Sequence, residues 1–377
     1  MIAPDDFAAC LSDQGVRLVT GVPDTILKTL LPSFDAHPAI RHVITTSEGE
    51  AAAMAFGHRL ATGDLTLTYL QNSGLGDVLD ILTSLASSDV YDVPLLFLVG
   101  WRGQVRVPDE PQHRRMGELT EALLRLADIR CELITSDGWR ESVMRCCEAV
   151  RLGTSCALLV AKGTFSGDAP APPERGSRPS REDALSKVIE AAPPNAVFVS
   201  TVGGISRELY EWRARAKQLH TTDLYLVGAL GSVLAVAHGV ALARPDMKVI
   251  VLDGDGSLLM GLGALATVGH LQPGNLLHVV FDNGVHDSTG GQPTASHTSD
   301  LAAIARACGY RSARTLTDED GVVGTLRLAV EAVGPAIVVI KVRPGSRSNL
   351  GRPSLEFARH GREFEGACNR GDARRGG

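Results

Sequence analysis

Residues 249–284 contain two short apolar runs, each of which stops at a polar turn that contains glycine. The first run ends at Gly254-Asp255-Gly256 and the second at Asp282-Asn283-Gly284, with a helix-like segment between them. This order predicts a β-strand, a helix and a second strand parallel to the first. Parallel strands joined in this way end at the same edge of a sheet, so the two turns are expected to lie side by side.

The two turns offer oxygen ligands of the kind that Mg²⁺ prefers in proteins. Asp255 supplies a carboxylate and Asn283 a side-chain carbonyl, and the neighbouring glycines let the backbone approach a ligand closely. The helix expected after Gly256 would present free N–H groups suited to phosphate. A simpler alternative is a Rossmann-like turn without a bound ion, in which Asp255 only caps the helix.

The two turns together resemble the GDG…N motif with which thiamine-diphosphate enzymes bind their cofactor and Mg²⁺. The resemblance implies three metal ligands, namely Asp255, Asn283 and the backbone carbonyl of Val285. It also implies that the cofactor contacts Asn283 and the run Gly254, Asp255, Gly256 and Ser257.

The same resemblance implies a catalytic glutamate in the N-terminal half, which exchanges a proton with the aminopyrimidine ring of the cofactor. Glu48 occupies the matching position, after the strand-like residues 42–46 and at the start of a segment of small residues. Glu50 is the alternative, and either acid could serve only to stabilise a helix N-terminus. Gly228 and Leu230 match the family's cofactor-bending turn, in which Leu230 is the wedge, although an ordinary apolar turn has the same composition.

Composition argues against several other functions. The 377 residues are 44% hydrophobic and include 40 glycines, enough for about two domains. The net charge of −6 and the lack of a long basic run argue against binding to nucleic acid or to a membrane surface. No signal-peptide pattern and no apolar stretch of membrane-spanning length occurs, so a cytoplasmic protein is expected. The 7 cysteines lack disulfide or zinc spacing, which indicates free thiols.

A segment rich in proline, glycine and charge divides the chain. Residues 167–183 predict a linker between domains 1–166 and 184–360, and residues 361–377 predict a disordered tail. Strand-like and helix-like stretches alternate in both halves, which predicts an α/β fold with two doubly wound parallel sheets. The resemblance assigns pyrimidine binding to the first domain and diphosphate binding to the second, with no middle domain. The expected strands lie near residues 18–20, 42–46, 65–71, 95–101, 156–161, 196–200, 224–227, 249–253, 278–281 and 336–342.

Further motifs resemble those of the phosphonopyruvate decarboxylases and the related sulfopyruvate decarboxylases. They include Gly-Val-Pro-Asp-Thr at 21–25, Ser-Arg-Glu-Leu at 206–209 and His-Asp-Ser-Thr-Gly-Gly-Gln-Pro at 286–293. The resemblance implies non-oxidative decarboxylation of 3-phosphonopyruvate to phosphonoacetaldehyde and CO₂, with thiamine diphosphate and Mg²⁺ as cofactors. Sulfopyruvate decarboxylation is the alternative, and a cofactor-binding subunit without catalytic activity is a more distant one.

The phosphonate of such a substrate requires cations, and the planar guanidinium group of arginine pairs with two oxygens at once. Arginines near glycines, prolines or family motifs are therefore candidates for substrate binding, although each could be a solvated surface residue: Arg102, Arg106, Arg347 and Arg352. Asp24, in the motif at 21–25, and Asn72, in a further motif Gln-Asn-Ser-Gly-Leu-Gly at 71–76, are polar candidates for the same pocket.

Two histidines are candidates for proton transfer, because imidazole titrates near neutral pH. His286 lies three residues after Asn283, and His113 lies in an Asp-Glu-Pro-Gln-His sequence. Asp287 is expected to support its loop instead. In the family the active sites lie between subunits, so a homodimer or a tetramer is expected.

Overall fold

The structure is a computed structural model that describes residues 1–167, 177–317 and 322–369. The described residues form two compact units, each built around a six-stranded sheet. Hydrogen-bonded neighbours are parallel in both sheets. The predicted α/β fold with two doubly wound parallel sheets is therefore confirmed. The predicted linker lies partly outside the described residues.

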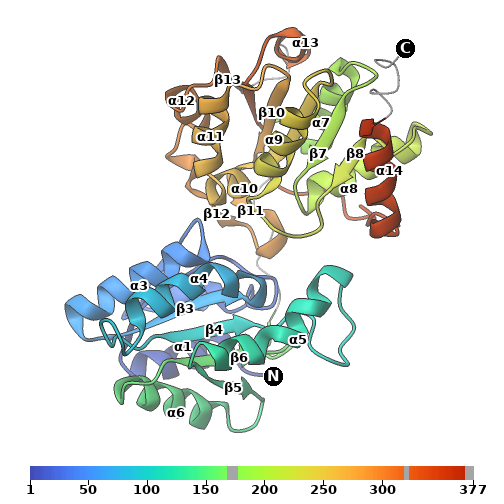
Figure 1. Cartoon of the computed structure of the whole chain (residues 1–377). Coiled ribbons are helices and arrows are strands. Elements are labelled where there is room, and N and C mark those ends of the chain that lie inside the picture. The colour runs from blue at the N-terminus through green and yellow to red at the C-terminus, as the bar shows by residue number, and fades with distance from the viewer. Residues whose placement is uncertain (168–176, 318–321, 370–377) are drawn as a thin grey trace. The chain divides into compact units, whose positions relative to one another are not determined.

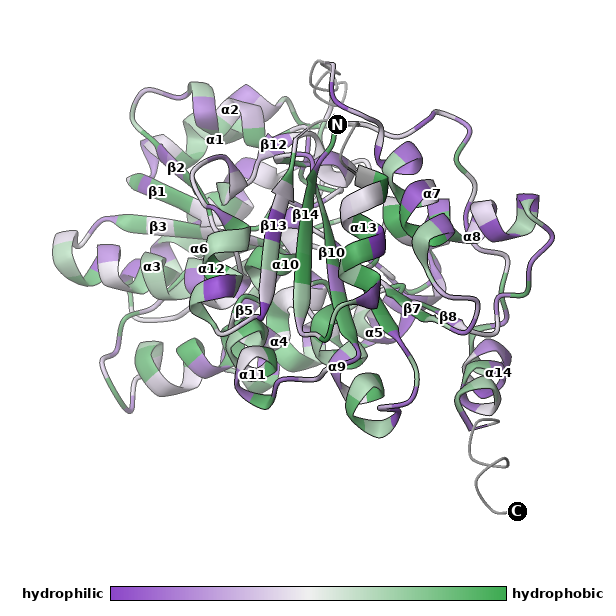
Figure 2. Cartoon of the chain, turned by 90° about the horizontal axis from the view of Figure 1, so that it is seen from above, coloured by the Kyte–Doolittle hydropathy of each residue, from purple (hydrophilic) through white to green (hydrophobic). Residues whose placement is uncertain are grey.

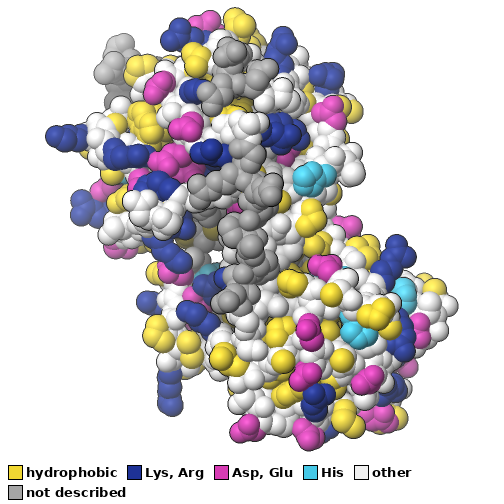
Figure 3. Space-filling view, turned by 180° about the vertical axis from the view of Figure 1, so that it is seen from behind, with side chains coloured by type: hydrophobic (Ala, Val, Ile, Leu, Met, Phe, Trp, Pro, Cys, Tyr) yellow, Lys and Arg dark blue, Asp and Glu magenta, His cyan; other side chains and the backbone are white. Residues whose placement is uncertain are grey.

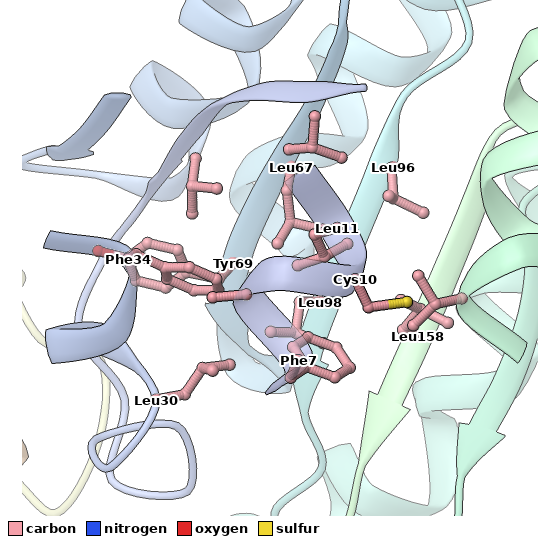
Figure 4. Packing of buried hydrophobic residues seen from close by; sticks show 14 of the residues in the cluster. Phe7, Cys10, Leu11, Leu30, Phe34, Leu67, Tyr69, Leu96, Leu98 and Leu158 are labelled. Carbon is pink, nitrogen blue, oxygen red and sulfur yellow. The ribbon is translucent and has the colours of Figure 1, made fainter. Parts of the chain in front are cut away.

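In the N-terminal unit, helices cover both faces of the sheet (Figure 1). The strands are β1 (Val16–Gly21), β2 (Arg41–Ile44), β3 (Leu65–Gln71), β4 (Leu96–Gly100), β5 (Arg130–Ile134) and β6 (Cys156–Val160), in the order β2-β1-β3-β4-β6-β5. The helices are α1 (Pro4–Asp13), α2 (Leu31–Ala36), α3 (Glu48–Thr62), α4 (Leu75–Ile81), α5 (Pro111–Leu126) and α6 (Trp139–Arg151). One apolar cluster joins the sheet to α1, α2 and α6, where Phe7 and Leu11 pack against strand residues such as Leu98 (Figure 4). A second cluster lies under α3, α4 and α5.

The C-terminal unit is built in the same way. Its sheet contains β7 (Val197–Ser200), β8 (Asp223–Tyr225), β9 (Val249–Gly254), β10 (Leu276–Asp282), β13 (Ser312–Leu316) and β14 (Ala336–Lys341), in the order β13-β14-β10-β9-β7-β8. One face packs against α9 (Val233–Ala243), α10 (Asp255–Met260), α11 (Gly263–Leu271) and α12 (Leu301–Ala307). The other packs against α7 (Arg181–Ala191), α8 (Gly204–Arg215) and α13 (Val322–Glu331). In Figure 2 the apolar strands β10 and β14 lie between these two layers of helices.

Each sheet contains a point at which the direction of strand addition reverses. The reversal lies between β1 and β3 in the N-terminal unit and between β7 and β9 in the C-terminal unit. Ligands of open parallel sheets bind outside the carboxyl ends of the strands at such points. In the two units these ends lead into the segments that begin at Val22, Asn72, Thr201 and Asp255.

Two strands of the six-stranded sheets and one helix depart from the sequence-based expectations. The edge strands β5 and β13 were not expected, because charged residues interrupt both (Arg-Cys-Glu-Leu-Ile and Ser-Ala-Arg-Thr-Leu). The prediction of a disordered tail is wrong for residues 361–369, which belong to α14 (Phe357–Asn369). This charged helix buries His360 and Phe364, four residues apart, and His360 Nε2 lies 2.8 Å from the Asp223 carbonyl oxygen. The remainder of the predicted tail lies outside the described residues.

Charged side chains of both signs lie on the surface of both units (Figure 3). Basic and acidic side chains are interspersed on the face of each unit drawn in Figure 3. Among the described helices, none is long and apolar enough to cross a membrane. All 7 cysteines are free thiols, and Cys10, Cys146, Cys147 and Cys156 are buried.

Candidate active site

The two turns of the βαβ segment lie side by side in the C-terminal unit. The parallel register pairs Phe281 of β10 with Gly254 of β9, so the residues that follow both strands meet at one edge. The short helix α10 (Asp255–Met260) begins at Asp255 itself, two residues earlier than expected from the sequence. The predicted metal-binding residues therefore come from two adjacent strand ends.

Asp255 is a buried carboxylate in a network of hydroxyl groups. Its Oδ2 accepts hydrogen bonds from the Thr294 and Ser296 hydroxyls, and Ser296 Oγ also lies 2.8 Å from Asp282 Oδ1. Burial raises the pKa of Asp255 to about 6, and repulsion from Asp282 adds to the effect. A bound cation would relieve both penalties, so this carboxylate fits a metal ligand. Sequence reasoning missed Thr294 and Ser296, which follow no strand of the main sheet.

Asn283 and Val285 form a tight turn after β10. The Val285 N–H donates to Asn283 Oδ1 at 3.1 Å, and Asn283 Nδ2 donates to Asp287 Oδ2 at 2.8 Å. No group of three His, Cys, Asp or Glu side chains that could hold a metal ion occurs among the described residues. A metal ion here would depend on amide and backbone oxygens beside Asp255, a donor set that suits Mg²⁺. The ligand assignment remains a prediction.

Ser257 connects α10 to the segment after β7 and to the loop before α9. Its hydroxyl shares a hydrogen bond of 3.0 Å with Thr201, which follows β7, and accepts one of 3.3 Å from the Gly231 N–H. A Cβ atom on Gly261 would lie 2.0 Å from the Gly231 oxygen, so α10 and the loop before α9 are in direct backbone contact. Leu230 in that loop is 38% exposed, which leaves its side chain accessible to a ligand.

His286 lies against Gly256. A Cβ atom on Gly256 would lie 3.2 Å from Cε1 of the imidazole ring. Burial lowers the pKa of His286 to about 4, so the ring is neutral at physiological pH. A neutral imidazole can accept a proton but is a poor store of one.

In the N-terminal unit, the two candidate glutamates make different contacts. Glu50 Oε2 accepts hydrogen bonds from the N–H and hydroxyl of Thr46, while its own N–H donates to the Ser47 hydroxyl. This is the reciprocal capping arrangement of a helix N-terminus. Glu48, the first residue of α3, takes no part in it and extends over Gly74. Glu50 is thus accounted for by helix capping.

The Glu48 carboxyl group lies among other acids. A Cβ atom on Gly74 would lie 2.4 Å from Glu48 Oε1, so the carboxyl rests directly on this glycine. Burial raises the pKa of Glu48 to about 6, with further contributions from Asp77 and Asp24. Asp77 is itself held by the Gly49 N–H at 2.6 Å. A carboxyl group with this pKa can both hold and release a proton near neutral pH.

Asp24 is buried beyond the end of β1. The Ile26 N–H donates to its Oδ2 at 3.0 Å, but Oδ1 has no hydrogen-bond partner among the described residues. Burial raises the pKa of Asp24 to about 6, against the opposing effect of Arg102. An unpartnered buried oxygen is costly, which is typical of a group reserved for a ligand.

Asn72 and Arg102 are bound mainly to the protein itself. The Asn72 amide donates to the Arg102 carbonyl at 2.8 Å and to Thr120 at 2.9 Å, and it accepts from the Arg102 N–H. The Arg102 guanidinium forms a two-pronged ion pair with Asp109, which lowers the pKa of that acid. His113 lies at the start of α5. Arg106 is exposed.

The remaining candidate arginines lie in the C-terminal unit. Arg347 forms ion pairs with Glu182 and Glu211. Arg207, which sequence reasoning left in a motif without a role, donates to the carbonyl oxygens of Leu350 and Gly351. Burial lowers the pKa of Arg207, and repulsion from Arg352 lowers it further. Arg352 therefore lies within electrostatic range of a second arginine, an arrangement that would attract an anion.

Comparisons with known proteins identify the family of this chain. Two family models match, the N-terminal TPP binding domain of thiamine pyrophosphate enzymes over residues 1–122 and the C-terminal one over residues 201–340. Phosphonopyruvate decarboxylases of Streptomyces viridochromogenes and Streptomyces hygroscopicus are 40% and 41% identical, each over 97% of this chain and 94% of the relative. A sulfopyruvate decarboxylase of Methanosarcina acetivorans is 26% identical over 92% of both chains. The chain therefore belongs to the phosphonopyruvate decarboxylase family of thiamine-diphosphate-dependent carboxy-lyases.

Proposed function

We propose that this protein decarboxylates 3-phosphonopyruvate to phosphonoacetaldehyde and CO₂, with thiamine diphosphate and Mg²⁺ bound. The observation that carries the proposal is that one chain contains both a buried acid with a raised pKa, Glu48, and the adjacent Asp255 and Asn283 turns. When bound, thiamine diphosphate supplies the nucleophilic carbon and accepts the electrons released with CO₂.

Each proposed residue has one physical task. Glu48 holds a proton at the aminopyrimidine ring, a task that suits its pKa of about 6. Asp255, Asn283 and the Val285 carbonyl hold Mg²⁺. The Ser257 hydroxyl and the backbone of Gly254 and Gly256 bind the diphosphate, with Gly228 and Leu230 against the thiazolium ring. The neutral His286 accepts and returns a proton, and His113 is the second candidate for that step.

The substrate phosphonate is proposed to bind to arginine. Arg352 is the preferred candidate because Arg207 lies within electrostatic range of it. Two neighbouring positive charges attract a dianion more strongly than one does. Arg347 and Arg102 already bind carboxylates, so a phosphonate would have to compete with Glu211 or Asp109. Asp24 is proposed to face the substrate with its unpartnered oxygen, and Asn72 to position the Arg102 loop.

The second candidate function is decarboxylation of 3-sulfopyruvate, which the Methanosarcina relative favours. The test is CO₂ release by the purified protein with thiamine diphosphate and Mg²⁺, with phosphonopyruvate, sulfopyruvate and pyruvate compared in parallel. Faster CO₂ release from phosphonopyruvate than from the other two acids supports the proposal, provided that Glu48→Gln abolishes this activity and still binds the cofactor. Faster CO₂ release from sulfopyruvate would change the proposed substrate and leave the proposed mechanism unchanged. Absence of turnover with all three indicates a non-catalytic subunit.

We further propose that the protein is a homodimer or a tetramer, with each active site between subunits. Helix α9 (Val-Leu-Ala-Val-Ala-His-Gly-Val-Ala-Leu-Ala) has one polar side chain, His238, and that side chain is buried. Its exposed residues are all small or apolar: Ala235, Val236, Gly239, Leu242 and Ala243. Such a face favours association with another subunit. Sedimentation that finds an active monomer would refute this assembly. The free cysteines support a cytoplasmic location.

A further inference from the structure

Asp287 is surrounded by hydrogen-bond donors from three segments of the C-terminal unit. Asn283 Nδ2 donates to its Oδ2 at 2.8 Å, and the Gly345 N–H lies 3.0 Å from both carboxylate oxygens. Arg181 Nη1 lies 3.4 Å from Oδ2. Each of these neighbours presents an N–H to Asp287, so both carboxylate oxygens serve as hydrogen-bond acceptors.

These contacts determine which way the Asn283 amide faces. Its two ends differ chemically, since the nitrogen only donates and the oxygen only accepts. The Asp287 carboxylate requires the nitrogen, and the Val285 N–H on the other side requires the oxygen. The reverse orientation would place oxygen against carboxylate and N–H against N–H. The chemistry of the neighbours therefore fixes the amide, and it directs the oxygen away from Asp287.

Arg181 holds Asp287 in turn. Its side chain is 8% exposed and forms a two-pronged ion pair with Glu208, with distances of 2.9 and 2.8 Å. Nη2 also donates to the Ser346 hydroxyl at 2.6 Å. A buried guanidinium bound on several sides cannot rotate freely, so it gives Asp287 a fixed support.

We propose that Asp287, supported by Arg181, is a positioning residue that keeps Asn283 Oδ1 directed toward Mg²⁺. The inference rests on the proposed function, because it takes Asn283 as a metal ligand. Partners of metal ligands typically change metal affinity by about 10-fold to 100-fold when they are replaced. An effect of that size is expected for Asp287, although it does not touch the metal.

The experiment measures the affinity of the full-length protein for Mn²⁺, used as the probe ion in the presence of thiamine diphosphate, by electron paramagnetic resonance of free Mn²⁺. In Asp287→Asn the new amide can present N–H to Asn283, which loses its fixed orientation, and the Mn²⁺ dissociation constant is expected to rise about 10-fold to 100-fold. Asp300→Asn is the matched control, since Asp300 is an exposed cap of α12 and asparagine caps equally well. The exchanged pair Asn283→Asp with Asp287→Asn restores one donor and one acceptor, and Mn²⁺ affinity is expected to recover.

The outcomes separate this inference from the function on which it rests. If the wild-type protein does not bind Mn²⁺ with thiamine diphosphate, the metal site itself is refuted. If it binds and Asp287→Asn binds equally well, only the positioning role is refuted. If circular dichroism without metal shows that Asp287→Asn does not fold, the Mn²⁺ affinity of the exchanged pair is the test of the positioning role. A folded exchanged pair that fails to bind Mn²⁺ refutes the inference.

Discussion

The contact between Glu48 and Gly74 leads to a prediction about a residue that carries no side chain. Gly74 has φ −79° and ψ −4°, which alanine adopts without strain. An alanine Cβ there would lie 2.4 Å from Glu48 Oε1 and 2.5 Å from its Cδ. Ordinary contacts begin at 3.4 Å, so the carboxyl group must move by about 1.0 Å (3.4 − 2.4). Displacements of about 1 Å at a reacting group can cost about 100-fold in rate.

Gly74→Ala is therefore expected to lower kcat about 100-fold, equivalent to about 2.7 kcal/mol in the activation free energy. Affinity for thiamine diphosphate should change little, because the turns proposed to bind the diphosphate belong to the other unit. Gly76→Ala is the matched control, since a Cβ on this exposed glycine two residues away meets nothing within 4 Å. The assay is CO₂ release under saturating substrate, with cofactor binding measured by titration calorimetry. A Gly74→Ala protein with more than half of wild-type kcat would show that Glu48 does not act from its position over Gly74.

Three further predictions concern stability and assembly. Asp24→Asn should raise the melting temperature of the cofactor-free protein at pH 8 and change it little at pH 4. The folded-state pKa of Asp24 is raised from 3.8 to about 6, so its penalty is absent below pH 3.8, grows as the pH rises toward 6 and is complete above that, at about 3 kcal/mol at most. An equal gain at both pH values in thermal scans would contradict this. Gly117→Ala should destabilise the N-terminal unit by about 1–3 kcal/mol in urea unfolding, since its Cβ would lie 1.8 Å from the Gly103 oxygen, and an unchanged midpoint would count against the contact. Val236→Arg should shift the sedimentation coefficient toward that of the monomer and lower activity. An unchanged sedimentation coefficient would show that α9 does not lie in a subunit interface.

The central part of the fold follows from local patterns in the sequence. Apolar runs that end at Gly254 and Asp282 predicted two adjacent strands, because buried parallel strands are apolar on both faces. The edge strands β5 and β13 were missed for the complementary reason. An edge strand contacts one neighbour and tolerates charge, so its sequence resembles that of a loop. Residues 361–369 illustrate a related error, because charge content concealed the spacing of His360 and Phe364 along one face of α14.

The candidate site likewise contains residues whose positions could be predicted from the sequence and residues whose positions could not. Asp255, Asn283 and Glu48 directly follow predicted strands, so their positions could be inferred from chain order. Arg181 could not, because its contact with Asp287 joins residues 106 positions apart and no local pattern marks it. The contact of Ser296 with Asp255 spans 41 positions and depends on how a loop returns to the sheet. The residues proposed to contact the metal and the cofactor could therefore be identified from the sequence, whereas the side chains that hold them in place could not.

The position of Arg181 at the first turn of α7 has a consequence for dividing the protein into fragments. The chain enters the C-terminal unit through Pro179, whose carbonyl oxygen accepts from the Arg343 N–H at 2.9 Å, and Arg181 then reaches Asp287. A C-terminal fragment that starts at β7 would keep every strand of its sheet and every proposed metal ligand. It would nevertheless lose the cation that anchors Asp287 and leave Glu208, which is 2% exposed, as an unpaired buried charge. A fragment that starts at Ser177 would preserve these contacts, whereas a fragment that starts at Glu182 would lack the arginine that supports the turn of proposed metal ligands.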